Sequence, residues 1–237
     1  MDRPASNPGL MPAATDIATA ERVSSFLRAV YGWMCAGLAI TAAVAYGVLG
    51  SPALLSGLRA SSWLVLGLVI VQLGLVFVLA ARVNQLAPAM AAGLFVAYSA
   101  LTGVTMSLIL LAYTGESVAT TFVVTAAMFG ALALYGTTTT RSLAGVGQFA
   151  FMGLIGLILA SLVGMFWHND GLQFLISVVG VIVFTALTAW DAQRLRQMAL
   201  ALPEGRTTSY AVVGALALYL DFINLFLSLL RIFGSRE

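Results

Sequence analysis

Apolar residues occur along this chain in long runs that are separated by short polar stretches. A helix needs about 20 apolar residues to cross the roughly 30 Å hydrocarbon core of a membrane. Six runs meet this requirement and predict spans over residues 28–49, 61–81, 88–112, 118–136, 145–167 and 171–190. A seventh run, residues 210–232, is also long enough to cross, although it contains Asp221, Asn224 and Ser228. The predicted fold class is an all-α membrane protein with seven transmembrane helices.

The first 25 residues differ from the rest because they are polar and contain three prolines. This composition predicts a disordered tail, residues 1–25, followed by a single transmembrane domain over residues 26–237. The tail lacks the apolar core and cleavage site of a signal peptide. We therefore expect the first helix to remain part of the protein.

The arginines indicate which side of the membrane the tail occupies, because basic loops stay on the cytoplasmic side. With seven spans, one side holds Arg3, Arg22, Arg28, Arg82, Arg141, Arg194, Arg196 and Arg206. The other side holds Arg59, Arg231 and Arg236. This imbalance favours a cytoplasmic N-terminus. A last segment that re-enters without crossing would fit the charges as well, but its length favours a full seventh span.

Composition supports the membrane assignment and excludes several function classes. Apolar residues make up 61% of the chain and charged residues only 8%, whereas soluble domains carry about 25% charged residues. The chain has no lysine, which excludes a retinal Schiff base, a P-loop and a pyridoxal enzyme. Cys35 has no partner for an internal disulfide and is expected to pack inside the first span, and His168 alone cannot anchor a histidine-rich metal site. A net charge of +2 gives no nucleic-acid footprint.

Two acids fall at membrane depth, where an ionisable group costs roughly 2.5–3.5 kcal/mol by insertion scales. Asp191 and Asp221 lie almost symmetrically about the turn signal at Pro203, Glu204 and Gly205. If the sixth span continues to about residue 200, an antiparallel hairpin brings both carboxyl groups to the same depth. Two such groups share one proton and titrate as a pair, so the spacing predicts a proton-dependent switch.

Polar residues at helical spacing accompany both acids. Thr185 and Thr188 precede Asp191 at intervals of three, and Asn224 and Ser228 follow Asp221 at intervals of three and four. Such a stripe should face the bundle interior or a water-filled path. The simpler alternative is local pairing, of Asp191 with Arg194 and of Asp221 with Asn224.

Several motifs resemble those of the transmembrane Bax-inhibitor-motif family. The last span reads ALYLDFINLF over residues 217–226 and LLRIFG over 229–234, similar to that family's last-helix signature. The stretch FTALTAWDAQ, residues 184–193, resembles its sixth-helix motif, with Trp190 where tyrosine is usual. Thr102-Gly103 with Ser107, and Tyr135-Gly136-Thr137 leading to Arg141, resemble its third and fourth helices.

The resemblance implies a bacterial member of the family with the last helix packed centrally among the other six. It also implies a pH-sensitive calcium leak in which Asp191 and Asp221 act as the proton-sensing pair and Arg82 as a latch. Gln72 stands where some members carry a glutamate, and Ser142 follows Arg141 where an acid is often found. Calcium would be the transported ion, bound transiently at the two aspartates with Thr188, Asn224 and Ser228 as supporting polar groups. No cofactor and no firm metal site are expected.

An enzyme, a transporter and a regulator are the alternatives to a channel. Intramembrane aspartyl proteases also use two aspartates, but their Gly-x-Gly-Asp motif is replaced here by Leu-Tyr-Leu-Asp, so no enzyme activity is expected. A proton-coupled transporter usually shows interrupted helices or an internal repeat, and neither is evident. A regulator or scaffold that binds membrane protein partners in cell-death or proteolysis control stays open.

The expected location follows from composition and charge. Arginine in place of lysine and spans rich in alanine and glycine suit a bacterial inner membrane with the N-terminus in the cytoplasm. The expected partners are the lipid bilayer, Ca²⁺ and H⁺, with no nucleic acid.

Overall fold

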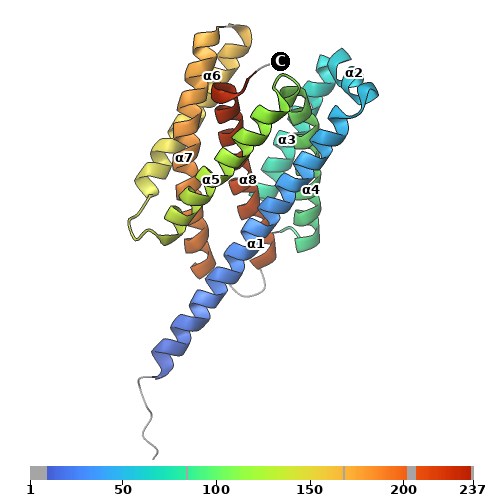
Figure 1. Ribbon diagram of the computed structural model, residues 1–237. Helices are drawn as coiled ribbons and strands as arrows, with labels where there is room; N and C mark the ends of the chain where they lie inside the picture. Colours follow the sequence, from blue (N-terminus) through green and yellow to red (C-terminus); the bar gives the residue numbers. More distant parts are fainter. Residues whose placement is uncertain (1–9, 84, 168, 202–206, 236–237) are drawn as a thin grey trace, which may run out of the picture.

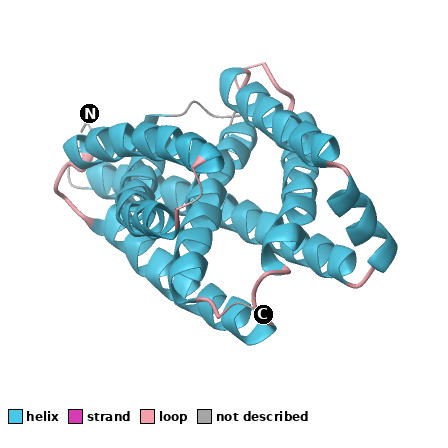
Figure 2. Ribbon diagram, turned by 90° about the horizontal axis from the view of Figure 1, so that it is seen from above, coloured by secondary structure: helices cyan, strands magenta, loops and turns pink. Residues whose placement is uncertain are grey.

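The structure is a computed structural model that describes residues 10–83, 85–167, 169–201 and 207–235. Within these residues all regular secondary structure is helical, and short loops join the helices (Figure 2). The eight helices are α1 (Leu10–Leu49), α2 (Pro52–Ala60), α3 (Ser62–Ala81), α4 (Pro88–Leu110), α5 (Gly115–Thr138), α6 (Ala144–Phe166), α7 (Asp170–Ala201) and α8 (Thr207–Phe233). Seven of them, all except α2, are long and apolar enough to span a membrane. The predicted all-α class with seven spans is therefore confirmed.

Residues at the helix ends explain where several spans begin. Pro88 opens α4, where the missing N–H costs no hydrogen bond. Ser61 caps α3 by accepting a hydrogen bond from the Leu64 N–H at 3.3 Å, and Thr114 caps α5 by accepting one from the Ser117 N–H, also at 3.3 Å. These caps satisfy backbone donors that the first helical turn leaves unpaired.

Helix α8 occupies the centre of the bundle (Figure 1). Its most apolar stretch is 72% buried, whereas the corresponding stretches of the other spans are 6–44% buried. It packs against α1, α3, α4, α5 and α7, and α6 packs mainly on α7. The central position of the last helix is confirmed, with α6 more peripheral than the rest.

The outer faces of the surrounding helices are apolar and exposed. They include Trp63, Ile70 and Phe77 of α3 and Phe149 and Met152 of α6, all more than 60% exposed. A protein in water rarely leaves such continuous apolar surface uncovered, whereas lipid covers it without penalty. The chain is an integral membrane protein.

Three observed boundaries differ from the predictions. Helix α1 begins at Leu10, so residues 10–25 of the predicted tail are helical; alanines and few helix breakers after Pro12 favour this extension. Helix α2 is an additional short helix between the first two spans, started by Pro52. Helix α7 continues to Ala201, as the antiparallel hairpin requires. Residues 1–9, His168 and the predicted turn at Pro203, Glu204 and Gly205 lie outside the described residues.

Glycines allow close approach at two helix contacts. A Cβ on Gly136 of α5 would collide with the backbone carbonyl of Ala189 on α7. A Cβ on Gly103 of α4 would lie 2.7 Å from the carbonyl oxygen of Thr41 on α1. Small residues bring membrane helices together in this way, because van der Waals packing drives their association.

We expect Gly136→Ala to lower the thermal stability of the purified protein, because the new methyl group meets backbone atoms that cannot turn away. Overpacking of this kind costs about 1–3 kcal/mol. Gly130→Ala, on the same helix with no atom within 4 Å of its Cβ, is the matched control and should leave stability unchanged or slightly raised. Equal melting temperatures for the two variants would contradict the close α5–α7 contact.

Candidate functional site: a buried pair of aspartates

Asp191 and Asp221 face each other across the antiparallel contact of α7 and α8. Their carboxyl groups are hydrogen-bonding partners. Asp221 is only 5% exposed, and Asp191 is half-buried. The structure therefore brings together the two acids that the sequence singled out.

The packing register explains how the side chains meet. Ser228 of α8 lies against Gly180 of α7, and Leu195 of α7 lies against Gly214 of α8. This register places the backbone of Asp221 about one helical turn, roughly 5 Å, beyond the level of Asp191. Side chains lean toward the N-terminus of their own helix. Because the helices are antiparallel, the two carboxyl groups lean toward each other and close the offset.

A hydrogen bond between two carboxyl groups requires a proton on one of them, since ionised carboxylates only accept. Among the described residues, Asp221 Oδ2 is buried without a hydrogen-bond partner. A buried carboxylate without partners is costly, so the pair requires a proton or a cation for neutralisation.

Among the described residues, Arg194 brings positive charge to the pair, on the side of Asp191. Arg194, one turn away on α7, attracts the Asp191 carboxylate. Its guanidinium carbon lies 5.6 Å from the centre of the Trp190 ring, and the side chain is exposed. Asp191 thus has a neighbouring cation, as the alternative of local pairing with Arg194 predicts. The polar neighbour of Asp221 is Asp191 itself.

The predicted supporting residues bind their own helices. Thr188 Oγ1 donates to the Phe184 carbonyl at 2.7 Å, Asn224 Nδ2 to the Leu220 carbonyl at 2.8 Å, and Ser228 Oγ to the Asn224 carbonyl at 2.8 Å. The alternative pairing of Asn224 with Asp221 is therefore not observed. Each side chain still has oxygen lone pairs that could accept a hydrogen bond or coordinate a cation.

The predicted latch, Arg82, does not reach the acids in this conformation. It is the exposed C-cap of α3, and its carbonyl accepts hydrogen bonds from Gln85 and Leu86. Within the described part of the chain, its guanidinium forms no ion pair with Asp191 or Asp221. Gln72, one of the positions where the sequence departs from the family pattern, donates to Thr105 Oγ1 at 3.2 Å.

A cavity of about 660 Å³ extends along α8 toward the pair and is bounded by α3, α4, α6 and α7. Its lining residues with polar groups are Gln72, Tyr98, Ser161, Gln173, Asn224, Ser228 and Arg231. Its lining ends at Phe184 and Leu220, the latter adjacent to Asp221, and does not include either aspartate. The cavity lies along the C-terminal half of α8, and its lining stops short of both aspartates.

A second buried polar cluster was not anticipated from the sequence. The hydroxyl groups of Thr41 and Tyr219 lie 2.6 Å apart, and Thr41 Oγ1 also lies 2.9 Å from the Ser99 carbonyl oxygen. The cluster links α1, α4 and the central α8. Its sequence signal is a set of mid-span polar residues, but these lie on three separate helices.

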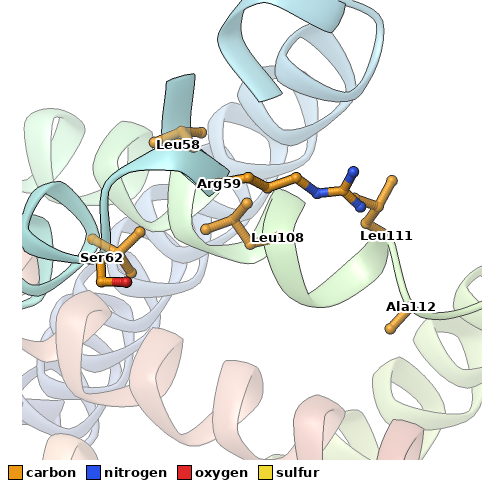
Figure 3. A pocket seen from close by; sticks show the side chains of 7 residues that line it. Leu58, Arg59, Ser62, Leu108, Leu111 and Ala112 are labelled. Carbon is orange, nitrogen blue, oxygen red and sulfur yellow. The ribbon is translucent and has the colours of Figure 1, made fainter. Parts of the chain in front are cut away.

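Among the residues that the structure describes, no group of three or more His, Cys, Asp or Glu side chains could hold a metal ion. At the opposite end of the bundle from the helix α1 start, a cavity of about 450 Å³ is lined by α2, α3 and α4 (Figure 3). The Arg59 side chain extends across it toward Leu111, over Leu108. Its lining contains no acid. The aspartate pair is therefore the candidate functional site.

Comparison with known proteins identifies the family. A family model described as inhibitor of apoptosis-promoting Bax1 matches residues 23–237. This chain belongs to the Bax inhibitor family. The inner membrane protein YbhL of Escherichia coli (strain K12) is 48% identical over 218 residues, covering 91% of this chain and 93% of YbhL. An uncharacterized protein of Deinococcus radiodurans is 43% identical over 226 residues, covering 95% of this chain and 96% of that protein.

These matches confirm the resemblance that the sequence motifs indicated, and they place the chain with bacterial members of the Bax inhibitor family. An uncharacterized protein of Borreliella burgdorferi is 43% identical over 216 residues, and the match covers 90% of this chain and 93% of that protein. The similarity therefore extends over nearly the whole membrane domain, and the residues matched by the family model include positions 191 and 221.

We expect the thermal stability of this Bax inhibitor family protein in detergent to fall from acidic to alkaline buffer. Loss of the shared proton leaves two like charges side by side, which repel. A change of 1 kcal/mol in the free energy of unfolding shifts the melting temperature of a protein of this size by about 2–4 °C. We therefore expect the melting temperature to fall by several degrees. Asp221→Asn should flatten the dependence, whereas Asp170→Asn, at an exposed acid in the first turn of α7, should not. Identical pH profiles for wild type and Asp221→Asn would refute the shared proton.

Proposed function

We propose that this protein is a pH-sensitive calcium leak channel whose gate is the Asp191–Asp221 pair. The observation that carries the proposal is the contact of the buried Asp221 carboxyl group with that of the half-buried Asp191 on the adjacent helix, with Asp221 Oδ2 lacking a partner among the described residues. With one proton the pair joins α7 to α8. Without it, the pair repels or takes up a cation.

The neighbouring cavity supplies the outer part of the proposed path. Asn224 and Ser228 line it, and their side-chain oxygens are ligands of the kind that Ca²⁺ accepts. Two carboxylates and a few neutral oxygens bind Ca²⁺ weakly, which suits passage rather than storage. Opening would require Phe184 and Leu220 to move away from the path, and separation of α7 from α8 would move both.

Arg82 retains the proposed role of a latch in a second conformation. In this structure it lies exposed at the end of α3. An arginine that approached either aspartate would neutralise it without a proton and hold the path closed.

The proposed location is the bacterial inner membrane with the N-terminus in the cytoplasm. Among the described residues, Arg22, Arg28, Arg82, Arg141 and Arg196 belong to the end of the bundle where α1 begins. Basic ends stay on the cytoplasmic side. The relative YbhL is named an inner membrane protein, which supports the same membrane. No enzymatic step is proposed.

The direct test is calcium flux into liposomes that contain only the purified full-length protein. We expect flux to depend on pH in the wild type and to lose that dependence in Asp191→Asn and Asp221→Asn. Asp170→Asn is the control and should retain it. Unchanged flux with an unchanged pH response in both aspartate variants would defeat the gate, and no flux in any protein would favour a non-transporting regulator.

A separate variant tests the path rather than the gate. Asn224→Leu removes an oxygen from the cavity wall and should reduce the calcium flux about tenfold, since one hydrogen bond or ligand is worth about 1 kcal/mol or slightly more. Its pH dependence should persist, because both aspartates are intact. Flux equal to that of the wild type would show that ions do not pass Asn224.

A further inference from the structure

A second feature of the bundle is a long groove between α1 and α5. Both helices pack on α8 but scarcely on each other. The groove contains an apolar cavity of about 530 Å³, with Phe222 of α8 in its lining, and a second cavity of about 400 Å³ nearer the start of α1. Thr137 lines both cavities, so they are neighbours along the groove.

One face of each helix lines the whole groove. On α1 the lining residues are Thr19, Ala20, Val23, Ser24, Leu27, Tyr31, Met34, Cys35 and Leu38. On α5 they are Phe122, Ala126, Phe129, Gly130, Ala133, Leu134 and Thr137. Steps of three and four residues keep each set on one side of its helix. Cys35 is exposed in this groove, so its expected role as a packed residue is wrong.

The lining changes from apolar to basic toward the start of α1. The cavity at that end includes Arg196, whose Nη1 donates to the Thr137 carbonyl at 2.9 Å. Arg22 Nη2 donates to the Leu200 carbonyl at 3.1 Å, at the same end of α7. Arg28 reaches back along α1 and donates to the hydroxyl and carbonyl oxygens of Ser24, which lines the cavity.

Arg196 thus lines the cavity at the mouth of the groove, and Arg22 and Arg28 border it by donating to the lining residues Leu200 and Ser24. Each guanidinium has five N–H donors, and the observed hydrogen bonds use one or two of them. Arginine binds phosphate oxygens in a bidentate manner. The mouth therefore suits a phosphate group.

We propose that this groove binds an anionic membrane phospholipid. One acyl chain lies between α1 and α5, and the phosphate lies at Arg22, Arg28 and Arg196. From Leu27 to Leu38 the apolar part extends about 16 Å along the helix, which matches half of a roughly 30 Å hydrocarbon core, the depth of one leaflet. A free phosphate would leave this apolar part uncovered, whereas a phospholipid occupies both parts. The proposed site does not depend on ion conduction.

Cys35 provides a reporter inside the groove, because it is the only cysteine of the chain. The full-length protein, purified in detergent and freed of lipid, is titrated with dioleoylphosphatidylglycerol or dioleoylphosphatidylcholine. The alkylation rate of Cys35 by N-ethylmaleimide is then measured by intact mass spectrometry. We expect the anionic lipid to protect Cys35 at about a tenfold lower concentration than the neutral lipid, since the charge-assisted contacts exceed 1.4 kcal/mol.

Variants separate the headgroup from the chain. The double change Arg22→Gln and Arg196→Gln should raise the protecting concentration of phosphatidylglycerol about tenfold, to that of phosphatidylcholine. Arg28→Gln, which breaks contacts only within α1, should act in the same direction if the double variant fails to fold. Arg59→Gln, in the cavity at the other end of the bundle (Figure 3), removes one charge as Arg28→Gln does; it is the control and should change nothing.

Filling the groove tests the chain site. Gly130→Leu places a side chain in open space within the groove and should weaken binding of both lipids, as counted by native mass spectrometry. Gly156→Leu, equally open on α6, is its control. Equal protection by both lipids, an effect of Arg59→Gln as large as that of the double variant, or protection by glycerol 3-phosphate as strong as by phosphatidylglycerol would each overturn the proposal.

Discussion

A carboxyl group in the interior of a membrane bundle has no bulk water to stabilise its charge, so it needs a proton, a cation or a second carboxyl that shares a proton. Asp221 lies in the middle of the central helix and is almost completely buried. Its described polar neighbour is Asp191, which has Arg194 beside it. The contact between α7 and α8 therefore depends on the charge state of this pair.

The central position of α8 gives that pair its influence over the bundle. Helix α8 packs against five of the other six spans, so a change at Asp221 acts on most of the structure at once. The Thr41–Tyr219 contact joins α8 to α1 on its other side. One side of the central helix is thus held by neutral hydrogen bonds, whereas the other is held by a titratable contact. This asymmetry would let α7 separate from α8 while α1 and α4 remain in place.

Sequence reasoning located the spans and the acids because both signals are local. Twenty apolar residues predict a membrane helix wherever they occur, and the symmetric spacing of Asp191 and Asp221 about one turn predicted their contact. The groove between α1 and α5, the exposure of Cys35 and the Tyr219 cluster were missed. Each depends on which face of an almost uniformly apolar helix turns inward, and apolar periodicity carries little information when lipid covers the outside. The start of α1 at Leu10 and the short helix α2 are not evident from the sequence, because polar residues and prolines are typical of irregular chain and also of the first turn of a helix.

The central claim is that the buried pair holds a single proton between two carboxyl groups. Infrared difference spectroscopy of the purified protein in lipid measures this directly, because a protonated carboxyl group has its own C=O stretching band. The account predicts such a band in the wild type at neutral pH, shifted or lost in both Asp191→Asn and Asp221→Asn and unchanged in Asp170→Asn. Absence of the band in the wild type from acidic to alkaline buffer would contradict it.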